Sequence, residues 1–194
     1  MEKKVKNKPT EREWDFKVLE VKRVARVTAG GKRFRIRAVV IVGNYKGKVG
    51  VGIEKGLDIS QAVEKAKNKA IKNAFEVPMV GAKTIPYEVE GKKGAGRVLL
   101  KPAKEGTSIV AGGAIRSLLL LAGYQNVSTK ILGVTKNPLI NVLAAFEALK
   151  KLSKTYKSKM AIRQKLLDLL SQNVDKIKSS DISEENIDDS DSSN

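Results

Sequence analysis

A cluster of glycine and lysine residues between positions 42 and 56 is the feature that most constrains this chain. Five glycines alternate with three lysines in this stretch, which an apolar segment enters and an amphipathic segment leaves. Glycine lets the backbone reach positive φ and approach a partner closely, and lysine beside it attracts phosphate. Two interpretations are open at this point: a cradle for a polyanion, or a hairpin whose glycines only form turns.

The charge of the chain favours an anionic partner. Lys and Arg number 38 against 21 Asp and Glu, for a net charge of +17, and six of the acids lie in residues 179–194 without a base. A folded body with this excess of positive charge repels itself unless an anion neutralises it. Nucleic acid is the leading candidate for that anion, ahead of a membrane surface.

Missing residue types exclude several classes of protein. The chain has no cysteine and no histidine, which removes disulfides, thiolate metal sites, the usual zinc sites and histidine-based catalytic triads. The segment that follows the initial Met is polar, and the longest apolar run, residues 118–122, is too short to cross a bilayer. We therefore expect a cytoplasmic protein without a signal peptide.

Residues 14–77 have the pattern of three strands followed by a helix. A first strand is expected over residues 17–28, with a bulge near Arg23, where the alternation of apolar and polar residues shifts by one. A glycine turn at residues 29–32 leads into a second strand over residues 33–42. Residues 1–13, in front of this domain, are basic and predict a flexible arm.

A short strand and an amphipathic helix complete this first domain. Val49, Val51 and Ile53 alternate with polar or small residues after the glycine–lysine cluster. Asp58, followed by Gln61 three residues later, is typical of a helix N-cap with a capping box. The apolar stripe of the helix has 3.6-residue spacing, and lysines crowd its remaining surface.

Arginines alternate along the second strand. Arg33, Arg35 and Arg37 are expected on one face, about 7 Å apart, which is close to the phosphate repeat of a nucleic-acid strand. A row of this kind can follow a phosphate backbone; the alternative is the solvated face of a half-buried sheet. Tyr45, at the tip of the glycine–lysine hairpin, is the one aromatic residue placed for base stacking.

The residues after position 77 predict a second domain. A linker is expected over residues 78–83, and an α/β domain with βαβ layering over residues 84–152. Its strands are expected over residues 84–90, 98–102 and 126–134, with a basic glycine turn over residues 91–97 and helices over residues 114–123 and from Pro138. An extension helix over residues 153–178 and a disordered acidic tail over residues 179–194 follow. The expected fold class is α+β.

Nucleotide binding has little support from the glycine-rich segments. Residues 43–49 have three residues between their glycines where a P-loop has four, and Val49 stands where Ser or Thr must hold Mg²⁺. The glycines of residues 47–52 reverse the dinucleotide-binding spacing. The small residues 106–113 enter a helix N-terminus, which favours anions, so a small-molecule kinase that uses the second domain is the rival interpretation.

Motifs across both domains resemble the bacterial small-ribosomal-subunit protein S-five family. They cover roughly residues 14–152 in order: Val21-Lys-Arg-Val24, Gly30-Gly31, the hairpin of residues 42–52, Gly96-Arg97-Val98, Lys101-Pro-Ala103, Glu105-Gly-Thr107, Ala111-Gly-Gly-Ala-Ile-Arg116, Ala122-Gly123 and Asn137-Pro138. The resemblance implies a double-stranded-RNA-binding-like βββα first domain and a non-enzymatic protein without a cofactor, a metal or a small-molecule substrate.

The resemblance also implies a place in the cell and a set of partners. These are the cytoplasmic ribosome, small-subunit ribosomal RNA, the neighbouring proteins S-four and S-eight, and mRNA near the entry channel, with no membrane. The implied roles are to stabilise the head of the subunit relative to its body and to contribute to translational accuracy. A double-stranded-RNA binder outside the ribosome is a further alternative.

Two sets of site residues follow from the residue pattern and the resemblance together. The predicted RNA-binding residues are Arg23, Val24, Arg26, Gly30, Gly31, Lys32, Arg33, Arg35, Arg37, Tyr45, Lys46, Gly47, Lys48, Lys55 and Arg97. The predicted protein-interface residues, which match the S-four contact of the family, are Glu105, Gly106, Thr107, Ser108 and Arg116. Ser108 stands where glycine is usual in the family.

Overall fold

The computed structural model describes residues 14–81 and 83–188, with side chains up to Gln164 and that of Leu167. The predicted arm over residues 1–13 lies outside this description. The chain separates at Ser153 into two compact units, which are considered one at a time. Both sheets belong to the first unit, and the described part of the second unit is helical.

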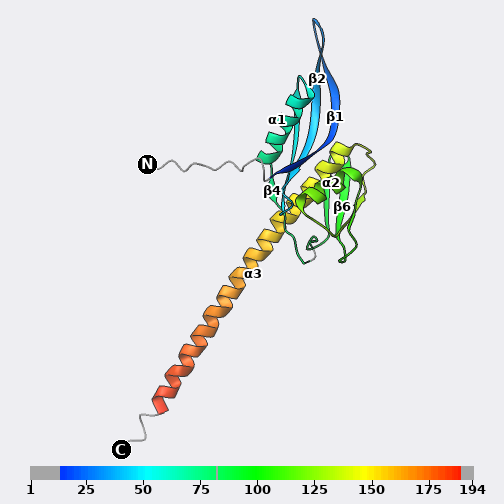
Figure 1. Cartoon of the computed structure of the whole chain (residues 1–194). Helices are drawn as coiled ribbons and strands as arrows, with labels where there is room; N and C mark the ends of the chain where they lie inside the picture. The colour runs from blue at the N-terminus through cyan, green and yellow to red at the C-terminus, as the bar shows by residue number, and fades with distance from the viewer. Residues whose placement is uncertain (1–13, 82, 189–194) are drawn as a thin grey trace, which may run out of the picture. The chain divides into compact units, whose positions relative to one another are not determined.

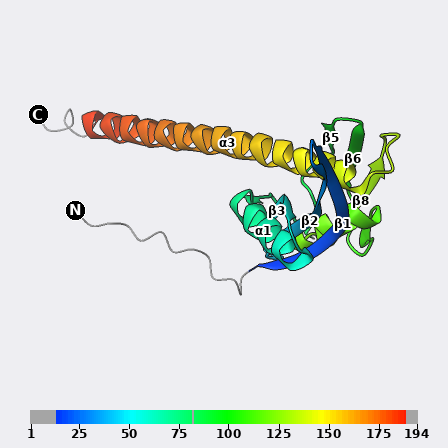
Figure 2. The same cartoon turned by 90° about the horizontal axis from the view of Figure 1, so that it is seen from above.

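A four-stranded antiparallel sheet and one helix form the βββα domain that the sequence predicts. The strands are β1 (Asp15–Thr28), β2 (Gly31–Gly43), β3 (Lys48–Gly56) and β4 (Phe75–Glu76), in the order β1-β2-β3-β4. Helix α1 (Ile59–Lys72) covers one face of this sheet, and the second sheet lies beyond the other face (Figures 1 and 2).

Small residues let α1 lie very close to the sheet. Ala62, Ala66 and Ala70 are fully buried against the β2 face that carries Ala38 and Val40. A Cβ on Gly52 of β3 would stand 2.0 Å from the carbonyl oxygen of Ala66, so that position accepts only glycine. Part of the glycine–lysine cluster therefore serves helix packing.

The start of α1 differs in detail from the predicted capping box. Asp58 is the N-cap, but its carboxylate accepts from the amide of Ile59, the first helical residue, at 2.8 Å, and not from the second or third as is usual. The Gln61 side chain, however, accepts from the amide of Leu57 at 3.1 Å and not from that of Asp58.

The bulge predicted near Arg23 is wrong in position. β1 pairs with β2 without a break from Glu20 to Thr28, and the irregularity falls between Val18 and Glu20. Beyond this point both faces of β1 are largely exposed, with Val21 at 40% and Val27 at 71%. Because neither face of β1 is buried there, the alternation of apolar and polar residues does not mark a buried face. The phase shift near Arg23 therefore did not indicate a bulge.

The second half of the first unit holds the predicted βαβ layer. Strands β5 (Val89–Lys93), β6 (Gly96–Pro102), β7 (Ile109–Val110) and β8 (Val127–Ile131) form a sheet in the order β5-β6-β8-β7. β7 and β8 are parallel and are joined by α2 (Gly113–Ala122), so the expected βαβ connection is confirmed.

Strand boundaries in this half differ from the sequence-based expectation. The strand predicted over residues 84–90 is wrong: Thr84 forms only an isolated bridge with Val80, and β5 starts at Val89. Pro86 has no amide hydrogen and interrupts any ladder through this segment. The turn predicted over residues 91–97 shrinks to Gly94 and Ala95, and β8 ends at Ile131 instead of residue 134.

Helix α3 (Pro138–Asp188) starts as predicted but does not end where expected. Asn137 caps it by accepting from the amide of Leu139 at 3.1 Å, and Pro138 occupies the first helical position. No glycine or proline follows Pro138, so nothing in the chain breaks the helix. The predicted extension helix is its continuation, and the helix reaches Asp188 within the predicted tail, whose last six residues lie outside the description.

One hydrophobic core joins the two halves of the first unit. Ile41, Val49 and Val51 of the first sheet belong to the same buried cluster as Leu118 and Leu121 of α2. The hairpin between β2 and β3 adds backbone bonds to the end of α2: the amide of Tyr45 donates to Leu121 at 3.0 Å and that of Gly47 donates to Ala122 at 2.9 Å.

Candidate nucleic-acid interface

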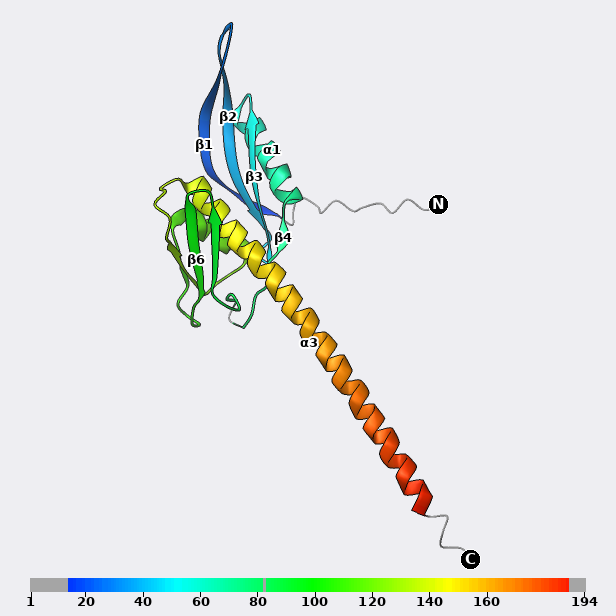
Figure 3. The ribbon, with the colours of Figure 1, turned by 180° about the vertical axis from the view of Figure 1, so that it is seen from behind.

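The ends of β1 and β2 project beyond the rest of the sheet. β3 pairs with β2 only from Ile36 to Gly43, so the β2 residues from Gly31 to Arg35 pair only with β1 (Figure 3). We call residues 22–35 the β1–β2 arm. It carries six cationic residues and no acid. Apart from Lys22, which pairs with Glu20 just outside the arm, none of these cations has an ion-pair partner among the described residues.

Strand register sorts the cations of the arm onto two faces. Arg26 stands directly opposite Arg33, and Arg35 stands opposite Val24. Paired residues share a face, so Arg26, Arg33 and Arg35 lie together on one side of the hairpin, and all three are exposed. Like charges directly opposite each other destabilise a sheet, and an anion on this face removes that repulsion.

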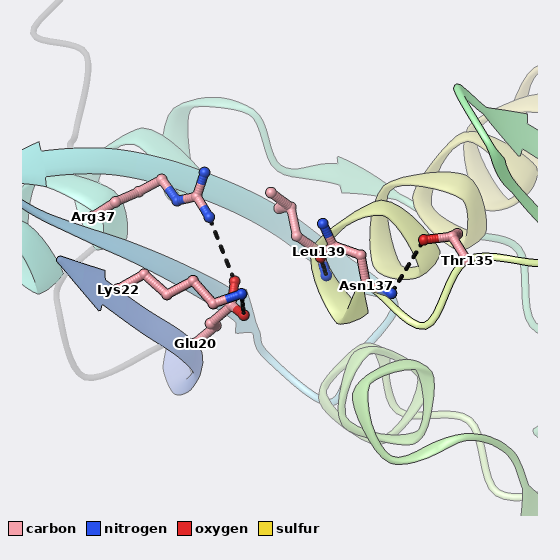
Figure 4. A network of polar contacts seen from close by, with 6 residues as sticks. All are labelled: Glu20, Lys22, Arg37, Thr135, Asn137 and Leu139. Atoms are coloured by element: carbon pink, nitrogen blue, oxygen red, sulfur yellow. Dashed lines mark hydrogen bonds and ion pairs between the residues drawn. The ribbon is translucent and has the colours of Figure 1, made fainter. Parts of the chain in front are cut away.

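Arg37 does not belong to the exposed arginine row that the sequence predicts. Its guanidinium lies 3.6 Å from the Glu20 carboxylate, which Lys22 also contacts at 2.5 Å (Figure 4). The Arg37 side chain is 27% exposed and that of Glu20 only 13%. Arg37 is therefore held by a carboxylate within the protein, and Arg26 takes its place beside Arg33 and Arg35.

The opposite face of the arm combines a cation with an exposed aromatic ring. The Arg23 guanidinium lies 3.7 Å from the centroid of the Phe34 ring, which is 48% exposed. Beside them, Val21, Leu57 and Ile59 line a shallow groove. A guanidinium held flat over a ring keeps its charge available to phosphate.

The tip of the arm is a two-residue loop. Ala29 and Gly30 connect the paired residues Thr28 and Gly31, and Gly31 has a φ of 121°. The Thr28 hydroxyl donates to the Gly31 carbonyl at 2.9 Å. Lys32 follows on the exposed side of β2, so the predicted tip residues are brought together at the end of the arm.

Backbone amides of the glycine–lysine hairpin are already used within the protein. Asn44 Oδ1 accepts from the amides of Lys46 and Lys48 at 2.9 Å each, and the amides of Tyr45 and Gly47 donate to α2. Gly47 itself is buried. A phosphate at this hairpin has to be bound by the exposed side chains of Lys46 and Lys48, not by a backbone cradle.

The Tyr45 side chain is tied to the start of β1. Its hydroxyl donates to Asp15 Oδ2 at 2.5 Å, and its ring is 47% exposed. This hydrogen bond holds the pKa of Asp15 below its ordinary value and raises the pKa of Tyr45. The ring keeps a free face for stacking, while the hydroxyl has a structural partner.

The last two predicted RNA contacts lie in different environments. Lys55 is exposed near the end of β3, opposite Arg37. Arg97, on β6, forms a two-point ion pair with Glu90, with its Nη2 3.1 Å from Oε2. The hydrogen bond from Arg97 lowers the pKa of Glu90. Arg97 is thus matched by an acid, as Lys22 is, whereas Arg26, Arg33 and Arg35 of the arm have no ion pair among the described residues.

The predicted protein-interface residues surround a cavity of about 700 Å³. Glu105, Gly106, Ser108 and Arg116 line it, while Thr107 is exposed next to it. The Arg116 guanidinium donates to the Ile109 carbonyl at 3.0 Å. Ser108 has a φ of 64°, a conformation that favours glycine, and its amide donates to Asn126 Oδ1 at 3.2 Å.

Several residues of this cavity were not predicted as part of a protein interface; Tyr45 was predicted as an RNA contact. Tyr45, Lys83, Tyr124 and Gln125 also line it. They belong to three separate segments of the chain, which only the fold brings together. Burial of Tyr124 raises the pKa of its hydroxyl, which donates to the Pro78 carbonyl at 2.9 Å.

Within residues 14–81 and 83–188, no group of acidic side chains is arranged to hold a metal ion. None of the helices in that part of the chain has a stretch apolar enough to cross a membrane.

The fold and this surface define a class of protein: a small, basic α+β protein with a cationic hairpin suited to a polyanion. The family model of ribosomal protein S5, N-terminal domain, matches residues 14–78, and that of ribosomal protein S5, C-terminal domain, matches residues 91–163. The chain belongs to the ribosomal protein S5 family, whose members are structural components of the small ribosomal subunit.

Named relatives agree with this assignment. Small ribosomal subunit protein uS5 of Thermotoga neapolitana is 49% identical over 140 residues, which cover 72% of this chain and 78% of the relative. The uS5 protein of Synechococcus elongatus is 46% identical over 142 residues, covering 73% and 78%. The uS5c protein of Cyanophora paradoxa is 43% identical over 151 residues, covering 78% and 89%. This family supersedes the kinase interpretation.

Proposed function

We propose that this chain binds small-subunit ribosomal RNA through the β1–β2 arm. The observation that carries the proposal is the placement of six cations without an acid on a hairpin that projects past the sheet. Such a hairpin can lie along a phosphate backbone and release its condensed counterions, which drives binding. Only a few aromatic rings are available, so recognition rests on the RNA backbone and shape.

Secondary RNA contacts come from cations away from the arm. Lys46 and Lys48 are exposed at the glycine–lysine hairpin, and Lys55 is exposed on β3. Arg23, stacked on Phe34, supplies a planar group on the second face of the arm. Arg37 and Arg97 contribute less, because Glu20 and Glu90 already neutralise them.

The cavity at Glu105–Ser108 and Arg116 is the proposed docking site for ribosomal protein S-four. Its support is the exposure of this loop and the family motif that it carries. Contacts with S-eight, a place near the mRNA entry channel, stabilisation of the subunit head relative to its body, and a contribution to translational accuracy rest on the family resemblance.

Salt dependence of RNA binding tests the arm proposal. The full chain is titrated with a small-subunit ribosomal RNA transcript at several salt concentrations, and compared with a variant in which Arg26, Arg33 and Arg35 are alanine. The logarithmic salt slope should fall by about 3, because each lost phosphate contact removes about 0.9. A matched variant removes Lys92, Lys93 and Lys101, which lie on the second sheet, and should keep its slope.

Two outcomes would contradict this proposal. Equal losses in both triple variants would show that charge alone matters and not its place on the arm. Wild-type binding that hardly changes with salt would exclude the phosphate mechanism altogether. Sedimentation of the native protein with small subunits in a cell extract separates the ribosomal role from that of an RNA binder outside the ribosome.

A further inference from the structure

A groove of about 410 Å³ lies where the base of the β1–β2 arm meets the start of α1, and we call it the Phe34 groove. Five apolar side chains and two arginines line it: Val21, Arg23, Phe34, Arg35, Ile36, Leu57 and Ile59. This volume lies within the range of small-ligand sites, about 300–1,000 Å³. The groove is therefore large enough to hold part of a ligand and not only solvent.

The fold leaves the apolar walls of the groove uncovered. Alternate residues of a strand share a face, so Phe34 and Ile36 lie on the same face of β2 as Ala38, which packs against α1. Past Ile36 the helix no longer covers this face. Leu57 and Ile59, at the entry to the helix, are 74% and 52% exposed. Exposed apolar side chains that share one groove mark a site of interaction.

A cation and an aromatic ring form a stacking surface in the groove. The guanidinium carbon of Arg23 lies 3.7 Å from the centroid of the Phe34 ring. Proteins recognise unpaired RNA bases by stacking them on aromatic rings and on guanidinium planes. Every base has a flat π-face, so a surface of this kind accepts any of the four bases.

The charges at the groove favour a ligand that carries phosphate. Arg35 lines the groove and also belongs to the cationic face of the arm, so the groove is continuous with the proposed phosphate contacts. Among the described residues, no acid lines it. Asp58, which lies between two lining residues in sequence, already accepts from the Ile59 amide at 2.8 Å and from the Ser60 hydroxyl at 3.0 Å.

A nucleotide satisfies this groove better than an apolar protein segment does. An apolar segment would cover the walls but would leave Arg23 and Arg35 without an anionic partner. A nucleotide joins a flat, weakly polar base to an anionic phosphate, and single-stranded nucleic acids are bound by this combination of stacking and positive charge.

We infer that the Phe34 groove binds one unpaired base of the RNA that lies along the arm. The base stacks on the Arg23–Phe34 pair and contacts Leu57 and Ile59, while an adjoining phosphate meets Arg35. The inference rests on the proposed RNA-binding function and names the base contact of that same site. The arm consequently distinguishes RNA with an unpaired nucleotide from a continuous duplex.

The test compares two RNAs on the full chain: a continuous duplex, and the same duplex with one extra, unpaired adenine nucleotide in its middle. The wild type should bind the second RNA more tightly by about fivefold or more, as expected for the stacking of one base. With ¹³C-labelled protein, nuclear Overhauser contacts should join the protons of the extra adenine to methyl groups of Leu57 or Ile59.

Phe34→Leu is the informative variant, because it removes the ring and keeps every charge. It should lose the preference for the unpaired adenine but keep the salt slope and the affinity for the continuous duplex. Leu57→Ser changes a side chain too exposed to affect folding and should also lower the preference. Val27→Ser is the matched control: Val27 is exposed on the same face of the arm but does not line the groove.

The outcomes separate this inference from the proposed function. If the wild type binds both RNAs equally and in a salt-dependent manner, the groove is not a base site, while the proposed function stands. A preference retained in Phe34→Leu would overturn the inference and leave the groove to an apolar protein segment. A preference lost equally in Val27→Ser would overturn it as well, because the shape of the arm would then decide. If neither RNA binds, both proposals fall.

Discussion

Gly123 lies directly against the backbone of Tyr45: a Cβ on residue 123 would stand 2.1 Å from the Tyr45 carbonyl oxygen. Both residues have positive φ, 97° for Gly123 and 55° for Tyr45. Gly123 ends α2, and Tyr45 lies in the hairpin between β2 and β3. The contact therefore fixes how the βββα half meets the βαβ half within the first unit.

Gly123→Ala should destabilise the fold strongly. The new methyl group meets backbone, which cannot rotate away, and alanine is strained at this φ. We expect a loss of about 3 kcal/mol or more in the free energy of unfolding, measured by urea denaturation. Gly30→Ala is the control, because a Cβ there has open space and ordinary φ, and it should change stability by less than about 1 kcal/mol.

Tyr45→Phe should raise the pKa of Asp15. In the wild type, the hydroxyl of Tyr45 stabilises the Asp15 carboxylate, and the pKa lies below its ordinary value of 3.8. That contribution to stability is present above the ordinary pKa and is lost as pH falls through the lowered one. NMR titration of the Asp15 carboxyl should show the upward shift; an unchanged titration curve would refute the role of this bond.

Arg37→Ala and Arg33→Ala should have opposite profiles. Removal of Arg37 leaves the poorly exposed Glu20 carboxylate with only Lys22, and we expect a loss of about 1–2 kcal/mol in stability but a small change in RNA affinity. Removal of exposed Arg33 should hardly change stability and should weaken RNA binding. The paired measurements are urea denaturation and RNA titration at one salt concentration. The reverse pattern would restore Arg37 to the RNA-binding row.

Ser108→Gly should stabilise the protein modestly. Serine at a φ of 64° is strained, and glycine removes the strain at some cost in chain entropy. The net gain should be about 0.5–1 kcal/mol in the free energy of unfolding. Because the amide of residue 108 still donates to Asn126, the loop around the cavity should keep its structure. A loss of stability would mean that the serine side chain has a partner worth more than the strain.

Tyr124→Phe should alter the alkaline limb of the stability curve. Burial raises the pKa of the Tyr124 hydroxyl above its ordinary 10.0 in the folded state, so its contribution is complete below about pH 10 and declines as pH rises further. The variant loses one hydrogen bond, about 1 kcal/mol at neutral pH. Above pH 10 the difference from wild type should shrink by about 1.4 kcal/mol per pH unit. A constant difference would contradict this.

Patterns among neighbouring residues predicted the helix ends and turns, because these features depend on residues close together in the chain. Asp58 and Asn137 cap helices as expected, and Gly123 ends α2 in the left-handed conformation. The two-residue tip of the arm and the βαβ connection also follow from turn residues and periodicity. Ser108, noted as a departure from the family pattern, coincides with a strained φ.

Features that depend on contacts between residues far apart in the chain could not be predicted from the sequence. The bond from Arg37 to Glu20 requires the register of β1 on β2, and alternation places Arg37 only on the correct face. The backbone bonds from the glycine–lysine hairpin to α2 join residues about 75 positions apart in the chain, which no local pattern reports. The sequence of the hairpin therefore resembles a phosphate cradle, whereas in the structure its amides bond to α2 and join the two halves of the first unit.

The position of β1 at the outer edge of the first sheet has a consequence for the protein before assembly. An unpaired strand edge is a template on which a second copy can add a strand, and such growth leads to aggregation. Lys17, Lys22, Arg23 and Arg26 lie along this edge. Two copies that approach edge to edge bring these charges together and repel each other, so the same cations protect the newly made chain from self-association until an anionic partner covers them.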